Sequence, residues 1–430
     1  MALLGGAAAG VFAETRDDAQ NFDQGVKASA ALEKVRAGAS SLDEPKAARQ
    51  TGALWISLAA EDMPKIEQAK LPLGPAVMTG DRASVFRVEE SALPALSAFM
   101  HEEFGRCGGF FAHDSSEEAQ ADLGPAPAVM AGPFTVDQQA FTAPAVAKVR
   151  EGELRATIEK LTSFHNRYYS AESGVAAAKW IQGRWQELAS SIPGATARLV
   201  QHPGWKQASV VLTIPGSEKP EEIVVLGGHL DSINGMWGGE ANRAPGADDN
   251  ASGIAVLTES LRVLAASGFR PRRTVEFMGY AAEEVGLRGS KEIAASYSKQ
   301  GKKVAAVIQF DMTNYKGSDK AIYLLTDHVD PGVTDFLGKL IDAYAQVPWS
   351  TTKCGYACSD HASWTRSGYP SSAAFESAFD GMNRDIHTDR DTLSKSGGTA
   401  EHSVSFAKLA AAFAAEVAKV AAPAAARSAR

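Results

Sequence analysis

The fold of this chain is best predicted from the stretch Ile223-Val224-Val225-Leu226-Gly227-Gly228-His229-Leu230-Asp231-Ser232. Its first four residues are apolar, as in a buried strand, and His229 follows where that strand is expected to end. In open α/β sheets, binding and catalytic sites form at the carboxyl ends of strands. The stretch therefore predicts an α/β fold with a polar site at the edge of its sheet.

Acidic and imidazole side chains recur in similar positions further along the chain. Gly246-Ala247-Asp248-Asp249-Asn250 is a glycine-bounded loop, and Ala282-Glu283-Glu284-Val285-Gly286 follows an expected strand over 274–279. Asp311 follows another expected strand, and His387 lies nearer the C-terminus. Carboxylates and neutral imidazoles are ligands that suit zinc and similar divalent ions. The sequence therefore predicts a metal centre that is richer in carboxylates than a single structural zinc site.

Two divalent ions suit this set of side chains better than one. A pair of ions ~3.5–4 Å apart needs a bridging carboxylate and further ligands on each ion. Glu283 is a surplus carboxylate beside a ligand, which is what a general base requires. Asp231 can hydrogen-bond the far imidazole nitrogen of His229 and orient it. The expected ligands are two imidazoles and three carboxylates: His229, Asp248, Glu284, Asp311 and His387.

Residues 134–422 alternate between strand and helix patterns. This alternation predicts an α/β three-layer sandwich around a central, mixed, mostly parallel β-sheet. The expected strands cover 208–214, 222–228, 274–279, 304–310, 321–326 and 372–376, and the expected helices cover 151–163, 173–190, 250–268, 289–300, 333–346 and 401–421.

The N-terminal third divides into shorter stretches. Residues 1–13 fit either a trimmed signal peptide or an Ala/Gly-rich tail, and residues 14–50, without a clear period, are expected to be a leader. Residues 51–115 predict a small α+β domain. The Ala- and Pro-rich acidic stretch 116–133 predicts a linker, and 423–430 a short tail.

The overall composition limits the classes of partner. The chain has 430 residues, of which 45% are hydrophobic, so it can bury a large core. Its formal net charge of -8 argues against nucleic acid or an anionic membrane as a partner. No apolar run reaches the ~18 residues of a membrane span. We expect a monomer that binds no nucleic acid and does not span a membrane.

Three cysteines leave several interpretations open. Cys354 and Cys358 lie four residues apart, and Cys107 stands alone. The close pair fits a disulfide, a thiolate metal site or two free thiols. No second cysteine pair or His at zinc-finger spacing follows, which argues against a structural zinc site. An export signal would favour the disulfide.

Over roughly residues 134–420 the chain resembles the secreted bacterial leucyl aminopeptidases of the M28 metallopeptidase type, which are two-zinc enzymes. The motifs that carry this resemblance are Gly227-Gly228-His229-Leu230-Asp231-Ser232, Ala244-Pro245-Gly246-Ala247-Asp248-Asp249, Ala281-Ala282-Glu283-Glu284-Val285-Gly286-Leu287-Arg288-Gly289-Ser290, Asp311-Met312-Thr313-Asn314-Tyr315, Cys354-Gly355-Tyr356-Ala357-Cys358-Ser359-Asp360-His361 and Ile386-His387-Thr388.

The resemblance implies roles for individual residues. Asp248 would bridge two Zn²⁺ ions, and the peptide bond between Asp248 and Asp249 would be cis. Glu283 would be the base, and Tyr356 would hydrogen-bond the developing oxyanion. Cys354 and Cys358 would form a disulfide that fixes the loop of Tyr356, leaving Cys107 free. Further residues are implied around the ligands and in the substrate pocket: Asp231, Asp249 and Ser359 beside the ligands, and Met312, Phe375, Phe379, Met382 and Ile386 in the pocket.

The small N-terminal domain resembles the propeptide of the same family, notably at His101-Glu102-Glu103 and Arg106-Cys107-Gly108-Gly109. The resemblance implies an exported bacterial proenzyme that a processing protease activates. The mature enzyme would remove large apolar residues from peptide N-termini. Two rival functions are a mono-zinc glutaminyl cyclase and a non-catalytic binding module on the same fold. The complete ligand set and Glu283 argue against both.

Overall fold

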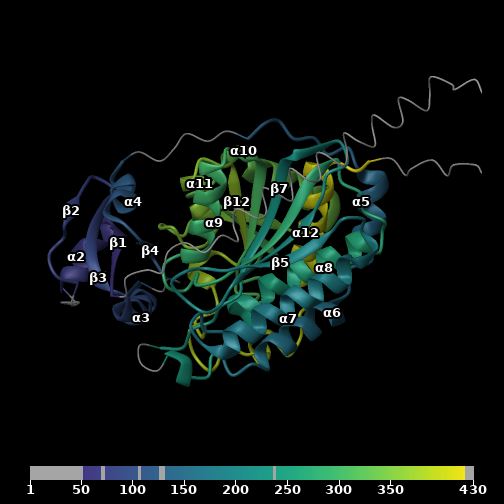
Figure 1. Ribbon diagram of the computed structural model, residues 1–430. Helices are drawn as coiled ribbons and strands as arrows, with labels where there is room; N and C mark the ends of the chain where they lie inside the picture. The colour runs from purple at the N-terminus through teal and green to yellow at the C-terminus, as the bar shows by residue number, and fades with distance from the viewer. Residues whose placement is uncertain (1–51, 69–72, 105–107, 125–130, 236–238, 422–430) are drawn as a thin grey trace, which may run out of the picture. The chain divides into compact units, whose positions relative to one another are not determined.

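A mixed eight-stranded sheet forms the centre of the C-terminal part of the chain in the computed structural model (Figure 1). Its strands are β5 (Thr196–Val200), β6 (Ser209–Ile214), β7 (Lys219–His229), β8 (Arg273–Tyr280), β9 (Lys303–Phe310), β10 (Ile322–Leu325), β11 (Trp349–Thr352) and β12 (Ser371–Phe375). They lie in the order β11-β10-β12-β9-β7-β8-β6-β5. Neighbours are parallel at β10–β11, β12–β9, β9–β7 and β7–β8, and antiparallel at the other three pairs. The expected mixed α/β sheet is confirmed.

The structure describes residues 52–68, 73–104, 108–124, 131–235 and 239–421, all of which belong to one compact unit that begins at Pro45. The expectations for 1–13, 14–50 and 423–430 and for Cys107 lie outside these residues. In the described part of the chain, no helix is long and apolar enough to cross a membrane.

Three adjacent parallel strands place the predicted ligands at one edge of the sheet. His229 ends β7, Asp311 directly follows β9, and Glu283 lies three residues after β8. Because these strands run parallel, their carboxyl ends meet at the same edge. Gly227 permits this close packing, since a Cβ there would lie 2.5 Å from the Tyr280 ring and 2.6 Å from Gln309 Oε1.

Helices cover both faces of the sheet, with α6, α7 and α8 on one face and α9 and α11 on the other (Figure 1). The described helices of this part are α5 (Gln139–Val146), α6 (Glu151–Thr162), α7 (Glu172–Leu188), α8 (Gly253–Ala265), α9 (Arg288–Lys299), α10 (Pro331–Leu340), α11 (His361–Arg366) and α12 (Ser403–Ala418). The main apolar core lies between β-strands and the layer of α6, α7, α8 and α12, and includes Trp185, Phe277 and Phe413. We call residues 131–421 the C-terminal subdomain.

A second, antiparallel sheet lies in the N-terminal subdomain, whose described residues are 52–68, 73–104 and 108–124. Its strand order is β2-β3-β1-β4, so that β4 is an edge strand. Its elements are β1 (Ala53–Ala59), α2 (Met63–Gln68), β2 (Met78–Thr79), β3 (Ala83–Glu89), α3 (Leu93–Phe104), β4 (Phe110–His113) and α4 (Ser116–Gln120).

The start of the expected linker differs from the prediction. Residues 116–123 form α4 and a following 3₁₀ turn, Ala121–Leu123. Ser115 caps α4, because its side chain accepts a hydrogen bond from the backbone N–H of Glu118 at 3.2 Å. The acidic composition that suggested a linker here serves contacts with the C-terminal subdomain.

Candidate active site

Two groups of buried ligand-type side chains meet at the carboxyl edge of the sheet and share Asp249. One contains His229 and Asp311, and the other contains Glu284 and His387. His229 Nε2 lies 3.0 Å from Asp249 Oδ1 and 3.2 Å from Asp311 Oδ1. His387 Nε2 lies 3.2 Å from Asp249 Oδ2 and 2.7 Å from Glu284 Oε2. Each oxygen of Asp249 thus faces a different imidazole.

The prediction that Asp248 is the shared ligand is wrong. Its carboxylate belongs to neither ligand group and accepts hydrogen bonds from Asn314 N at 3.0 Å and Asn383 Nδ2 at 3.2 Å. The predicted cis peptide bond is displaced by the same single residue, since it joins Asp249 to Asn250. The four other predicted ligands, His229, Glu284, Asp311 and His387, belong to the two groups.

The donor set fits divalent cations. Both carboxylate oxygens of Glu283 and Nδ1 of His387 are buried without a hydrogen-bond partner among the described residues. Such atoms are costly to bury unless something compensates them. Two imidazoles and three carboxylates match the ligand preferences of zinc and its neighbours. The residues therefore fit bound metal.

Glu283 occupies the place that a general base needs. Its side chain is 1% exposed, and Oε2 lies 4.0 Å from Nε2 of His229. Burial is the largest cause that raises the pKa of Glu283 well above its usual range; His229 opposes the rise, and nearby carboxylates add to it. Glu283 belongs to neither ligand group. The carboxylate therefore lies next to the centre without being placed to hold an ion.

Asp231 fixes the loop that carries both glutamates. Its two oxygens accept the backbone N–H groups of Glu283 at 3.0 Å and Glu284 at 3.1 Å. Asp231 Oδ1 also lies 3.5 Å from Nδ1 of His229. The structure thus places Asp231 beside the ligand that it was expected to orient.

Two buried residues that the sequence analysis missed position the loop of Asp249. The oxygens of Asp391 accept the backbone N–H of Asp248 at 3.1 Å and of Asp249 at 3.0 Å. The Arg167 guanidinium, in a residue that is 1% exposed, donates to the carbonyls of Leu230, Pro245 and Gly246. Asp391 had a weak signal, as an acid four residues after His387, whereas Arg167 lies far from every motif in the sequence.

The predicted substrate-pocket residues gather beside Asp311. They form one apolar cluster, with Phe379 packed against it: Met312, Phe375, Met382 and Ile386, together with Leu325, Ala373, Cys354, Tyr356 and Cys358. A small pocket opens among most of them and is also lined by Asp311. An apolar recess beside a ligand group suits a hydrophobic substrate side chain.

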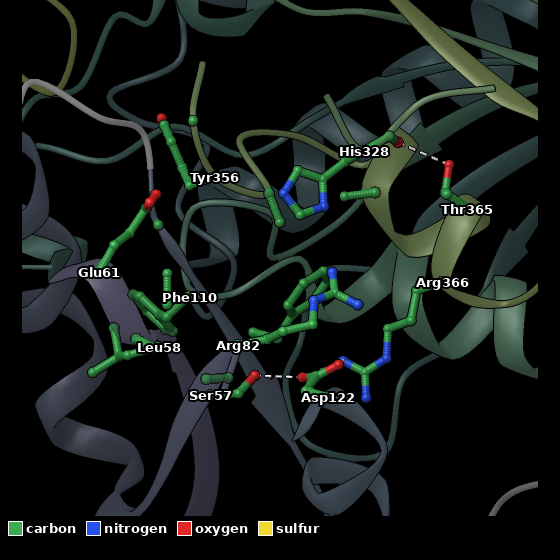
Figure 2. A pocket seen from close by; sticks show the side chains of 18 of the residues that line it. Ser57, Leu58, Glu61, Arg82, Phe110, Asp122, His328, Tyr356, Thr365 and Arg366 are labelled. Carbon is green, nitrogen blue, oxygen red and sulfur yellow. Dashed lines mark hydrogen bonds and ion pairs between the residues drawn. The ribbon is translucent and has the colours of Figure 1, made fainter. Parts of the chain in front are cut away.

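The loop of Tyr356 is closed by a disulfide between Cys354 and Cys358. Tyr356 is 3% exposed and lines the substrate pocket. Tyr356 also lines a larger cavity between the two subdomains, together with Glu61 and His328 (Figure 2). Ser359 lies on the pocket wall and accepts a hydrogen bond from Gln309 Nε2 at 3.2 Å.

The N-terminal subdomain reaches the metal-ligand groups through α3. The ring of His101 lies 4.7 Å from the ring of His387, with 41° between the ring planes. A shallow pocket flanks this contact and is lined by Glu102, Phe104 and Arg384. One face of the candidate site is therefore covered by the N-terminal subdomain.

A buried site in which two ligand groups share one carboxylate is typical of metal-dependent hydrolases. The family model "Peptidase family M28" matches residues 209–412. A probable leucine aminopeptidase of Arthroderma benhamiae is 39% identical over 316 residues, which are 72% of this chain and 85% of that protein. Leucine aminopeptidase 1 of Uncinocarpus reesii is 42% identical over 275 residues, which are 61% of this chain and 69% of that protein.

A solved structure extends the similarity to the N-terminal subdomain. The crystal structure of the LapA aminopeptidase of Legionella pneumophila has a TM-score of 0.76 and 28% identity, covering 86% of this chain and 99% of that chain. This share exceeds what the C-terminal subdomain alone provides. The chain belongs to peptidase family M28 and is a metallo-aminopeptidase, a hydrolase.

Proposed function

We propose that this chain is an exported two-zinc aminopeptidase that removes large apolar residues, such as leucine, from the free N-termini of peptides. The observation that carries the proposal is Asp249, whose two oxygens face two different histidines, each with a further carboxylate. Two metal positions joined by a bridging carboxylate are the arrangement that two-metal hydrolases use.

In this proposal Asp249 would hold both ions, His229 and Asp311 would help to hold one, and Glu284 and His387 would help to hold the other. When bound, the two ions supply Lewis acidity toward the scissile carbonyl and the attacking water. Glu283 takes a proton from that water and passes it to the leaving amine. The hydroxyl of Tyr356 donates a hydrogen bond to the oxygen on which negative charge develops.

The side chain of the N-terminal substrate residue would occupy the apolar pocket beside Asp311. Met312, Phe375 and Met382 line that pocket, and Asp311 is the only charged residue among the described residues that line it. Burying a leucine side chain there is favourable by roughly 1.5–3 kcal/mol. A lysine or glutamate side chain would have to bury a charge without a partner, which is costly. This contrast supports a preference for large apolar residues.

The N-terminal subdomain would be a propeptide that inhibits the enzyme and assists its folding. The contact between His101 and His387 supports inhibition, because it fills space beside a ligand that substrate would need to approach. A processing protease that removes the subdomain would then activate a monomeric enzyme. The Cys354–Cys358 disulfide supports export, because disulfides persist mainly in oxidising compartments.

The two rival functions fit the site less well. A mono-zinc glutaminyl cyclase does not need a second complete group of ligands around a shared Asp249. A binding module without activity does not need Glu283 buried beside those groups. Both features are present together in this chain.

The experiment that tests the proposal compares three substrates after digestion of the N-terminal subdomain. Leu-, Lys- and Glu-p-nitroanilide are assayed while the zinc content is measured on the same sample. We expect close to two zinc ions per chain and the highest kcat/KM on the leucine substrate. A single zinc with cyclisation of N-terminal glutamine would support the cyclase, and metal binding without turnover would support the binding module.

A further inference from the structure

We propose that the N-terminal subdomain stays bound to the C-terminal subdomain after the connection between them is cut, so that cutting alone does not activate the enzyme. The binding surface is formed by the loop 282–288 and by α9 and α11. Its partner is the N-terminal subdomain, which supplies the edge strand β4 and acidic side chains. The part of this inference that concerns activity rests on the proposed inhibitory function, whereas the part that concerns binding does not.

A backbone contact attaches β4, the edge strand of the N-terminal sheet, to the loop 282–288, which carries Glu283 and Glu284 and which we call the catalytic loop. The N–H of Ala112 in β4 donates to the carbonyl of Gly286 at 3.1 Å, two residues after Glu284. Gly286 permits this approach, because its φ is +102° and a Cβ there would lie 2.8 Å from Ala112 Cβ and 2.9 Å from the Phe110 ring. An edge strand that adds backbone hydrogen bonds to a partner is a common mode of docking.

Ion pairs across the same surface all have the same arrangement of charge. The C-terminal subdomain supplies the cations and the N-terminal subdomain the carboxylates: Arg288 with Glu90 at 2.6 Å, Lys291 with Glu118 at 3.1 Å, and Arg366 with Asp122 at 2.5 Å. Figure 2 shows Arg366 reaching toward Asp122 across the cavity between the subdomains. Complementary charge of this kind fixes the register of a docked surface.

The pair between Arg288 and Glu90 matters more than the pair between Lys291 and Glu118. Glu118 is 51% exposed, so solvent screens its attraction to Lys291 and the pair contributes little. The Arg288 side chain is only 2% exposed, and its guanidinium lies 4.4 Å from the centre of the Trp205 ring. Taking Glu90 away would leave a buried cation without its carboxylate, which is strongly unfavourable.

The apolar core of the N-terminal subdomain continues into the C-terminal subdomain. One cluster of buried side chains contains Ile56, Leu93 and Phe110 from the first and Tyr169, Trp205 and Val285 from the second. Separating the subdomains would expose this shared cluster to water, including Val285 in the catalytic loop. An interface with a common core resembles permanent complexes more than transient ones.

The residues on either side of the connection 125–130 are each attached to their own subdomain. Gly124 accepts a hydrogen bond from Arg82 at 3.2 Å, and the N–H of Ala131 donates to Asp330 at 3.0 Å. A cut between them breaks none of the contacts described above. It removes only the covalent link, which raises the effective concentration of the two parts but does not form the interface.

The test uses the full chain with a recognition sequence for a specific protease inserted within 125–130. After complete cutting, gel filtration reports whether the N-terminal fragment elutes with the rest of the chain, and Leu-p-nitroanilide reports activity. The matched variants are Glu90→Lys, which opposes Arg288, and Glu67→Lys, an equal charge change at an exposed position of α2. Uncut samples of both variants are melted thermally to establish that they are folded.

We expect the cut wild-type fragments and the cut Glu67→Lys fragments to elute together, with activity no higher than that of the uncut chain. The cut Glu90→Lys fragments should separate, because their dissociation constant should be about tenfold larger or more, and activity should rise on separation.

Separation of the cut wild-type fragments would overturn the inference. Joint elution of these fragments together with full activation by the cut would also overturn it. Joint elution of fragments from a chain that was already fully active before cutting would overturn inhibition but leave the binding intact. If Glu90→Lys does not fold, the wild-type elution still decides.

Discussion

Asp248 and Asp249 are adjacent in the chain, yet their carboxylates belong to separate networks. Asp249 faces His229 and His387, whereas Asp248 accepts hydrogen bonds from Asn314 and Asn383. A one-residue step thus separates the carboxylate that the two ligand groups share from one that is bonded to Asn314 and Asn383.

This difference predicts that two neighbouring substitutions have unequal effects on metal content. Asp249→Ala should remove a ligand from both positions, so that metal measured by atomic emission falls from close to two ions per chain to less than one. Asp248→Asn should retain most of the metal, because an amide oxygen still accepts the hydrogen bond of Asn314. The reverse pattern would restore Asp248 as the shared ligand.

The sequence indicated that the loop 246–250 carries a ligand, but the predicted choice of Asp248 rather than Asp249 does not agree with the two ligand groups. Both are Asp, both precede the same helix, and both are buried. The choice depends on the conformation of residues 247–252, where Asp391 accepts two backbone N–H groups from a position more than 140 residues away. Interactions over such a separation leave no local pattern. His229, Glu284 and Asp311 were predicted because each follows its strand closely.

The strands and helices of the fold were likewise predicted where they have a local sequence pattern and missed where they do not. The central strands β7, β8 and β9 each contain an apolar run and were predicted to within a few residues, whereas the edge strands β5 and β11 were missed. In both edge strands most residues are partly exposed, so neither an apolar run nor a clear alternation appears. Helix α5 was also missed, since it is short and contains Pro144.

Glu283→Gln should separate the role of the base from that of a ligand. The substitution keeps the shape of the side chain but removes its ability to take a proton. Metal content should remain unchanged, while kcat falls by ~10²–10⁴-fold. Loss of metal in this variant would make Glu283 a ligand instead, and a kcat/KM within a few-fold of wild type would exclude it as the base.

Asp391 is predicted to act on the metal centre through the backbone that carries Asp249. Asp391→Ala removes both acceptors, so zinc affinity measured by chelator competition should fall ~10–100-fold, as for other residues that orient ligands. Asp391→Asn keeps one oxygen and should lose less. Thermal melting of the metal-free variants separates this effect from general destabilisation, and an unchanged zinc affinity in the alanine variant would contradict the positioning role.

The disulfide predicts a definite pattern of thiols in exported protein. Peptide mapping without reduction should find Cys354 joined to Cys358, with Cys107 as a free thiol. Asp327 helps to fix this loop, because it accepts the backbone N–H of Cys354 at 3.2 Å and of Gly355 at 2.6 Å. A bridge between Cys107 and either of the other two cysteines would contradict the assignment.

The substrate pocket offers the sharpest test of side-chain preference. Ala373 lines the pocket and is 3% exposed, so a larger residue there must project into the space that a substrate leucine would fill. Ala373→Leu should lower kcat/KM on Leu-p-nitroanilide by at least the ~10–200-fold that a single methylene misfit in an apolar pocket produces. Ala-p-nitroanilide is the control, because its methyl group does not need that space and its kcat/KM should change little. An equal loss on both substrates would mean that the substitution disturbs Asp311 beside the pocket, and metal content would then fall as well. Unchanged selectivity with intact metal would place the substrate side chain elsewhere.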